Sequence, residues 1–158
     1  MNILILGGGG REHSLAWAVK QNPKCDRLIV APGKAGIAAL TETSDLDIED
    51  GAAVGEFAAE NAIDFVIIGP EAPLAAGVAD ACEAAGLLAF GTSGAAARLE
   101  AYKAFTKEVC DAAGAPTAGW ARFTEVEAAQ DYIAAQGAPI VVKADGLAAG
   151  KGVVVAET

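Results

Sequence analysis

The hydrophobic residues of this chain fall into short apolar runs, separated by stretches in which apolar positions recur every three or four residues. The apolar runs predict buried strands at residues 2–6, 26–31, 64–68 and 87–90. The helical spacing between them predicts helices at residues 11–21, 50–61 and about 75–85. Strands that alternate with helices are joined by crossovers, and crossovers build a parallel sheet covered on both faces. We therefore expect an α/β fold in the first part of the chain.

The pattern changes after Gly94. Residues 95–113 have helical spacing with a break near Glu100, and Gly-Ala-Pro-Thr at 114–117 interrupts the helix. The later pattern predicts a strand at 120–123, a helix at 124–135 with Thr124 as N-cap, and strands at 139–144 and 153–156. A chain of 158 residues has room for one domain and part of another. We expect one domain at 1–100 and the incomplete beginning of a second at 101–158.

Each of the four predicted strands in the first part ends in a loop rich in glycine or proline. These loops begin at Gly7, Pro32, Gly69 and Gly91. In open parallel sheets, ligands bind at the carboxyl ends of the strands. The sequence therefore predicts a binding site where these loops meet along one edge of the sheet.

Composition narrows the class of ligand. The net charge is −10, and the eleven lysines and arginines are scattered, so nucleic acid and anionic membranes are disfavoured as partners. No apolar run reaches the roughly 18 residues of a membrane helix, and the first residues do not resemble a secretion signal. The three cysteines are far apart and only one histidine is present, which disfavours disulfides and structural zinc. We expect a cytoplasmic protein with reduced cysteines.

The last twenty residues are the strongest functional signal. An apolar run leads into Lys143, a Gly/Ala-rich loop carries Lys151, and a second apolar run follows. This order predicts a strand, a glycine loop and a strand that fold over a polyphosphate, with amides and ammonium groups on its oxygens. A Walker A motif does not fit, because three residues rather than four separate Gly146 from Gly150, and Gly152 rather than Ser or Thr follows the lysine.

The glycines at residues 7–10 suggest a second anion site, at the start of the first helix. They do not form the dinucleotide motif G-x-G-x-x-G, since its last position would be Glu12 or His13. The second strand also ends in Val-Ala-Pro, where that motif's acidic partner would stand. Nicotinamide and flavin cofactors are therefore disfavoured.

Four motifs occur in order: GGGGREH at 7–13, APGKAG at 31–36, GPEAPL at 69–74 and KADGLAAGKGV at 143–153. Together they resemble the N-terminal part of the phosphoribosylamine–glycine ligase (glycinamide ribonucleotide synthetase) family of the ATP-grasp superfamily, over essentially the whole chain. The chain departs from the family at three positions. The family often has Asn or Ser where this chain has Gly8, usually has Pro in place of Thr92, and usually has Ser in place of Tyr102. The chain is also much shorter than the family's full length.

The resemblance implies a Rossmann-like pre-ATP-grasp domain followed by the beginning of an ATP-grasp fold. It implies that ATP joins glycine to 5-phosphoribosylamine through glycyl phosphate, giving glycinamide ribonucleotide, ADP and phosphate in purine synthesis. It also implies Mg²⁺ or Mn²⁺, with ligands expected outside this segment. We expect small-molecule partners only, no catalytic residue within these residues, and no turnover by this chain alone; the sequence does not indicate an oligomeric state. A related ATP-grasp carboxylase and a non-catalytic nucleotide-binding module are the alternatives.

The resemblance also implies two sets of binding residues. Those for the sugar phosphate and amine are Gly8, Gly9, Gly10, Arg11, Glu12, Pro32, Gly33, Gly36, Gly69, Pro70, Glu71 and Pro73. Those for ATP are Lys103, Lys143, Asp145, Gly146, Gly150, Lys151 and Gly152.

Structural alternatives remain open at several of these positions. The glycine loop can be a plain tight turn, Glu12 a first-turn acid that stabilises the helix, and Glu71 a solvated loop acid. Lys103 can lie on a solvated helix face. For Lys143 such an alternative is weak, because a lysine within an otherwise apolar strand needs an anionic partner.

Overall fold

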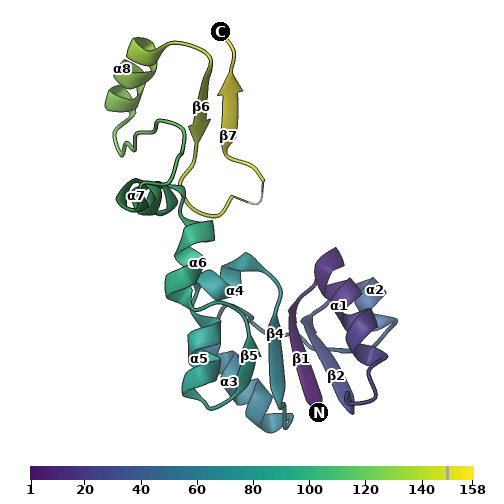
Figure 1. The fold of residues 1–158 in the computed structure, drawn as a ribbon. Coiled ribbons are helices and arrows are strands. Elements are labelled where there is room, and N and C mark those ends of the chain that lie inside the picture. The colour runs from purple at the N-terminus through teal and green to yellow at the C-terminus, as the bar shows by residue number, and fades with distance from the viewer. Residues whose placement is uncertain (149) are drawn as a thin grey trace. The chain divides into compact units, whose positions relative to one another are not determined.

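The computed structural model describes residues 1–148 and 150–158 and divides into two compact units, Met1–Ala97 and Arg98–Thr158. The first unit contains a five-stranded sheet with strand order β3-β2-β1-β4-β5, in which every pairing is parallel (Figure 1). Its strands are β1 (Asn2–Gly7), β2 (Arg27–Pro32), β3 (Glu42–Thr43), β4 (Phe65–Ile68) and β5 (Leu88–Phe90). Its helices are α1 (Gly10–Lys20), α2 (Ala35–Ala38), α3 (Gly51–Glu60), α4 (Glu71–Ala75) and α5 (Val78–Ala84). The predicted parallel α/β fold is confirmed.

Helices cover both faces of this sheet. Successive side chains of a strand point to opposite faces, and β1 follows this rule. Leu4 and Leu6 pack in one core cluster with residues of α3 and α5, whereas Ile3 and Ile5 pack in another with residues of α1 and α2. Strand β1 is apolar at both alternating sets of positions because both of its faces are buried.

The strand register brings the predicted loops to one edge. Leu6 at the end of β1 pairs with Ala31 of β2 and with Ile68 of β4. The next residues continue the contact, since the Gly33 amide donates to the Gly7 carbonyl at 3.3 Å and the Gly69 amide donates to the Leu6 carbonyl at 3.2 Å. The chain therefore leaves three neighbouring strands at one level, as the sequence predicts.

Local chemistry sets several element boundaries. Asp50 begins α3, because its carboxylate accepts the amides of Ala52 and Ala53 at 2.9 and 3.1 Å. The helix predicted at about 75–85 corresponds to α5, whereas α4 lies almost wholly in the segment predicted as a loop; Gly77, with φ +83°, separates the two. The short α2 and the two-residue β3 were not predicted.

The second unit begins within α6 (Gly94–Ala101) and holds two further helices and an antiparallel hairpin. These elements are α7 (Lys103–Ala113), α8 (Val126–Gln136), β6 (Ile140–Lys143) and β7 (Val153–Ala156). The helical break expected near Glu100 lies at Tyr102, whose backbone is extended.

Two predictions for the second unit are wrong. Residues 120–123 form no strand. The Trp120 indole donates to Asp111 at 2.9 Å, and the Phe123 ring packs on Tyr132 with centroids 5.2 Å apart. These side chains serve local packing rather than a sheet. The N-cap of α8 is Glu125 rather than Thr124, and its side chain makes no capping bond.

Truncation of a fully buried side chain of β1 should strongly lower the stability of the first unit. Leu4 has no exposed surface, so Leu4→Ala is expected to lower the free energy of unfolding by about 2–5 kcal/mol. Leu88→Ala removes the same atoms from edge strand β5, where the side chain is 64% exposed, and should change it by less than about 0.5 kcal/mol. Urea unfolding followed by circular dichroism measures both, and equal losses would contradict the packing described.

Candidate functional site

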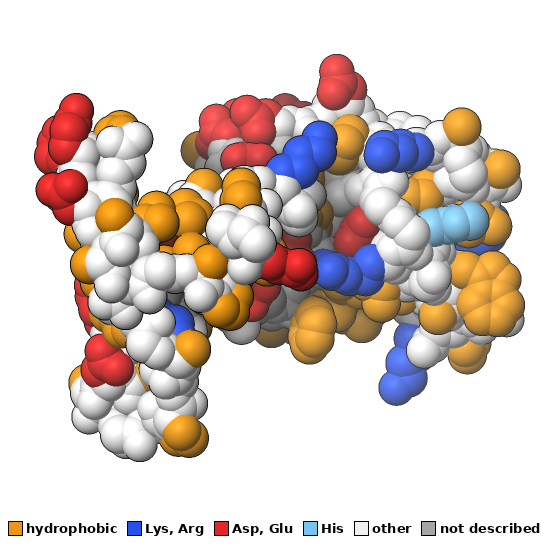
Figure 2. Space-filling view, turned by 90° about the horizontal axis from the view of Figure 1, so that it is seen from above, with side chains coloured by type: hydrophobic (Ala, Val, Ile, Leu, Met, Phe, Trp, Pro, Cys, Tyr) orange, Lys and Arg blue, Asp and Glu red, His pale blue; other side chains and the backbone are white. Residues whose placement is uncertain are grey.

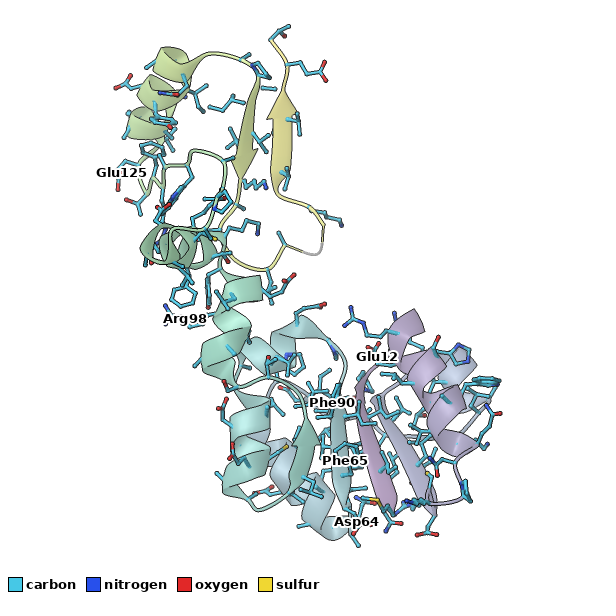
Figure 3. All side chains as sticks on the ribbon, viewed as in Figure 1. Glu12, Asp64, Phe65, Phe90, Arg98 and Glu125 are labelled. Carbon is cyan, nitrogen blue, oxygen red and sulfur yellow. The ribbon has the colours of Figure 1, made fainter. Side chains whose placement is uncertain are left out.

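Among the residues that the structure describes, Glu12 is the one charged side chain that is buried, with 4% of its surface exposed. It lies in the first turn of α1, beside the ends of β1 and β4 (Figure 3). Its carboxylate oxygen Oε2 accepts the amide of Gly9, the N-cap of α1, at 2.6 Å. This is the reach-back bond by which an acid at the third helical position holds the residue before the helix. The predicted alternative of a helix-stabilising acid therefore describes this contact.

The same carboxylate explains glycine at two loop positions. A Cβ atom on Gly7 would lie 2.7 Å from Glu12 Cγ, and one on Gly69 would lie 2.2 Å from Glu12 Oε1. A third close approach joins the neighbouring loop, because a Cβ on Gly8 would lie 2.9 Å from the carbonyl oxygen of Gly33. The loops after β1 and β4 thus enclose the Glu12 side chain, and the loop after β2 meets the loop after β1 backbone to backbone.

Two opposite charges lie exposed at this loop cluster. The Arg11 guanidinium donates to the carbonyl of Gly69 and pairs with Glu71, with Nη2 3.1 Å from Oε1. A hydrogen bond from its own backbone amide and one from Arg11 together lower the pKa of Glu71. Glu71 is therefore ionised and oriented at neutral pH, and both side chains are positioned to meet a polar ligand.

The other residues predicted for the sugar phosphate lie in the same loops. Gly9, Gly10, Pro32 and Gly36 are exposed, whereas Gly8, Gly33, Gly69 and Pro70 are partly buried. Pro73 is among the fully buried residues, which favours a packing role in α4 over contact with a ligand. A small hollow beside β5, lined by Asp80, Glu83 and Gly91 among others, includes none of the predicted site residues.

In the second unit, the loop between β6 and β7 has the predicted strand–loop–strand form. The Ala144 amide donates to the Gly152 carbonyl at 2.7 Å and closes the loop at its base. Gly146 and Gly150 have φ +94° and +76°, values that glycine adopts without strain. We call residues 144–152 the flap; residue 149 lies outside the described residues.

The three predicted ATP lysines of this unit differ in environment. Lys103, the first residue of α7, is partly buried and its Nζ donates to the Gly146 carbonyl at 2.7 Å. The alternative of a solvated helix face is therefore wrong for Lys103. Lys143 is exposed, as are two of the other three residues of β6, so burial does not demand an anionic partner for it. Lys151 is also exposed.

Asp145 and Gly146 also contact other parts of this unit. Asp145 Oδ1 accepts the amide of Ala104 at 3.3 Å, and Oδ2 lies 3.3 Å from Arg122 Nε. Arg122 was not predicted as a site residue, because its segment was predicted as a strand and Asp145 lies 23 positions away in the sequence.

Residues 1–148 and 150–158 include no group of three or more His, Cys, Asp or Glu side chains arranged to hold a metal ion. None of the helices described has both the length and the apolar character needed to cross a membrane.

The parallel sheet, the helix pair and the flap hairpin are matched by two sequence-family models. The model described as "Phosphoribosylglycinamide synthetase, ATP-grasp (A) domain" matches residues 101–158, so this part belongs to an ATP-grasp domain. The model described as "Phosphoribosylglycinamide synthetase, N domain" matches residues 1–100. The chain belongs to the phosphoribosylglycinamide synthetase family.

Curated relatives agree with this assignment. Phosphoribosylamine–glycine ligase of Agrobacterium fabrum is 58% identical over 158 residues, and that of Vibrio parahaemolyticus is 54% identical over 160. Each match covers 100% of this chain and 37% of the relative, so the chain spans little more than a third of their length.

Solved structures agree on the fold. Phosphoribosylamine–glycine ligase of Thermotoga maritima matches with a TM-score of 0.75 and 26% identity, over 100% of this chain and 36% of that one. The biotin carboxylase domain of Hydrogenobacter thermophilus 2-oxoglutarate carboxylase matches with a TM-score of 0.74 and 18% identity, over 98% and 37%. At that identity the second match shows the fold alone.

The buried carboxylate predicts an unequal pair of substitutions. Glu12→Ala leaves an unfilled space beneath Gly7 and Gly69 and removes the bond to the Gly9 amide, so it should lower the free energy of unfolding by about 1–3 kcal/mol. Glu12→Gln keeps the shape and an acceptor, and should lose less. Glu56→Ala, at an exposed position of α3, should change stability by less than about 0.5 kcal/mol. A loss at Glu12→Ala no larger than at Glu56→Ala would contradict the role of Glu12.

The Arg11–Glu71 pair predicts a titration. The carboxyl carbon of Glu71, followed by NMR, should titrate below the ordinary glutamate value of about 4.3, because the folded state favours the ionised form. The stabilisation is present above the unfolded pKa and is lost as the pH falls through the folded pKa. Arg11→Ala should move the midpoint upward, whereas Arg27→Ala, which breaks the pair with Glu42, should leave it in place. An unmoved midpoint in Arg11→Ala would show that the pair does not set this pKa.

Proposed function

We propose that this chain provides the sugar-phosphate-binding domain, residues 1–100, and the first part of the ATP-binding domain, residues 101–158, of a phosphoribosylamine–glycine ligase. The observation that carries the proposal is the meeting of three loops at the start of α1, two of them packed on Glu12 and the third on Gly8, beside Arg11 and Glu71. Identity of 53–58% to several ligases of this name supports it. A cytoplasmic location is part of this proposal.

The phosphate of 5-phosphoribosylamine would bind at the start of α1. The amides of Gly10 and Arg11 lie in the first helical turn, where no carbonyl of the helix itself can accept them. The helix dipole favours an anion there. The Gly9 amide already donates to Glu12, so its role is to hold the loop rather than the phosphate. Gly8, Gly33, Gly36 and Pro32 would line the sugar.

Arg11 and Glu71 would contact different groups of the sugar phosphate. A phosphate competes with Glu71 for the Arg11 guanidinium, since charge-assisted bonds to phosphate are among the strongest available to arginine. Glu71 can then accept hydrogen bonds from ribose hydroxyls or from the amine. Gly69 and Pro70 would fix the direction of this acid through the start of α4.

The second unit would bind ATP. Lys103, Lys143 and Lys151 would meet the phosphate oxygens, and the flap glycines Gly146, Gly150 and Gly152 would let the backbone approach them. The match of residues 101–158 to the family's ATP-grasp (A) domain supports a nucleotide in this unit. Magnesium or manganese would neutralise phosphate charge, with ligands from residues other than those described.

The chemistry follows from these positions. A glycine carboxylate is a poor electrophile, so it would first attack the γ-phosphate of ATP, forming glycyl phosphate and ADP. The amine of phosphoribosylamine would then attack the acyl carbon, and phosphate would leave. The described residues contribute binding and orientation, which bring the reacting groups together and stabilise the charges on the phosphates. A carboxylase role is disfavoured, because the carboxylase structures share only the fold with this chain.

Ribose 5-phosphate, a stable form of the sugar phosphate, tests the first site by calorimetry. The chain is expected to bind it with one saturable site. Gly8→Ala places a methyl group 2.9 Å from the Gly33 carbonyl and should separate the loops, which costs about 1–3 kcal/mol and weakens binding at least about fivefold. Gly55→Ala, on α3, meets nothing within 4 Å and should bind as the unchanged chain does. No binding, or equal binding by both variants, would contradict the proposed site.

A further inference from the structure

In the second unit, the side chains of Lys103 and Asp145 each form a hydrogen bond with the backbone of the residue that follows the other in the sequence. The Asp145 carboxylate accepts the amide of Ala104, and the Lys103 ammonium donates to the carbonyl of Gly146. Residues 103 and 104 begin α7, whereas residues 145 and 146 lie at the base of the flap. We call these four residues the clasp. They join the start of a helix to a loop about 40 positions later in the sequence.

The start of α7 needs a capping group from elsewhere. Its own N-cap residue, Tyr102, makes no side-chain hydrogen bond to the helix, and tyrosine has no short acceptor with which to cap. The first amides of a helix find no acceptor within the helix. Asp145 supplies the missing acceptor from the flap, and its negative charge lies at the positive end of the helix dipole.

Both oxygens of Asp145 are engaged by protein donors. Oδ1 also accepts the Gly146 amide at 3.1 Å, and Oδ2 pairs with Arg122. Partial burial alone would raise the pKa of Asp145, but the hydrogen bonds from Ala104 and Gly146 and the charge of Arg122 outweigh it and lower the pKa. The side chain is 28% exposed, compared with 59% for Arg122. Asp145 is therefore a fixed anion directed at protein groups.

We propose that Asp145 is a positioning residue that acts through Lys103. By capping α7 it fixes the first residue of the helix, and hence the lysine that would reach the nucleotide phosphates. This inference rests on the proposed ATP site, and it changes the role of Asp145 within that site. A carboxylate repels a triphosphate, and this one already has partners on both oxygens, so Asp145 orders the lysine and the flap rather than contacting ATP.

The clasp also suggests what a nucleotide changes. A phosphate competes with the Gly146 carbonyl for the Lys103 ammonium, because an anionic acceptor binds an ammonium more strongly than a neutral one does. The bond from Asp145 to Ala104 is not in that competition. Lys103 would therefore leave the flap backbone for the phosphate while α7 stays capped.

Hydrogen exchange without any nucleotide tests the clasp itself. In Asp145→Ala, the amides at the start of α7 should exchange about 5- to 10-fold faster, the change expected from the loss of one helix cap. Asp145→Asn keeps an acceptor oxygen but not the charge, so its exchange rates should lie between those of the unchanged chain and of Asp145→Ala. Asp131→Ala removes an exposed acid from α8 and should leave exchange at α7 unchanged. Unchanged exchange in Asp145→Ala would overturn the proposal.

ATP affinity tests whether Asp145 acts through Lys103. Asp145→Ala removes the charged hydrogen bond that positions Lys103, so it should weaken ATP binding about tenfold. This effect is expected only while Lys103 is present. In a Lys103→Ala background the further effect of Asp145→Ala should disappear, a non-additivity that a general loss of stability would not produce. Additive losses would overturn the positioning role. If the chain binds no ATP while exchange at α7 still responds to Asp145→Ala, the proposed function fails and the clasp is upheld.

Discussion

A single buried carboxylate sets how the loops after β1 and β4 meet, and the loop after β2 packs on the loop after β1. Burying a charge is costly unless it is hydrogen-bonded, and Glu12 meets this condition through the amide of Gly9. Its side chain fills the space that a Cβ would take at Gly7 or Gly69, so the loops close only because both are glycines. The parallel register brings the strand ends to one level, and Glu12 fixes the backbone beyond them. The exposed Arg11 and Glu71 depend on this arrangement for their position.

The second unit solves a similar problem with a remote acid. There Asp145 holds the start of α7 from the flap, and Lys103 holds the flap in return. In both units a carboxylate accepts hydrogen bonds from amides near the start of a helix. A neighbouring basic residue, Arg11 or Lys103, donates to a loop carbonyl. In the proposed enzyme, these basic groups are the ones that meet phosphate. The acids order the binding groups, and the helix starts and cations supply the attraction.

The sequence was sufficient to predict those structural features that depend on a local pattern of residues. Strands such as residues 2–6 were predictable because burial on both faces demands a continuous apolar run, and the loop edge follows from alternating strands and helices. The two-residue β3 is too short to leave a pattern, and residues 120–123 were predicted as a strand because aromatic residues that pack locally resemble one. Lys143 seemed to need a partner because an apolar strand was assumed to be buried, yet β6 is largely exposed. The clasp and Arg122 depend on contacts distant in sequence, which no local pattern encodes.

The central claim is that the loops held by Glu12 bind a sugar phosphate. An ¹⁵N-resolved NMR titration of the chain with ribose 5-phosphate tests it most directly, because it reports every backbone amide at once. We predict saturable shifts concentrated at Gly8, Gly10, Arg11, Gly33 and Glu71, with inorganic phosphate shifting the α1 amides alone. Shifts that do not saturate, or that lie on other parts of the first unit and leave these loops unchanged, would contradict the account.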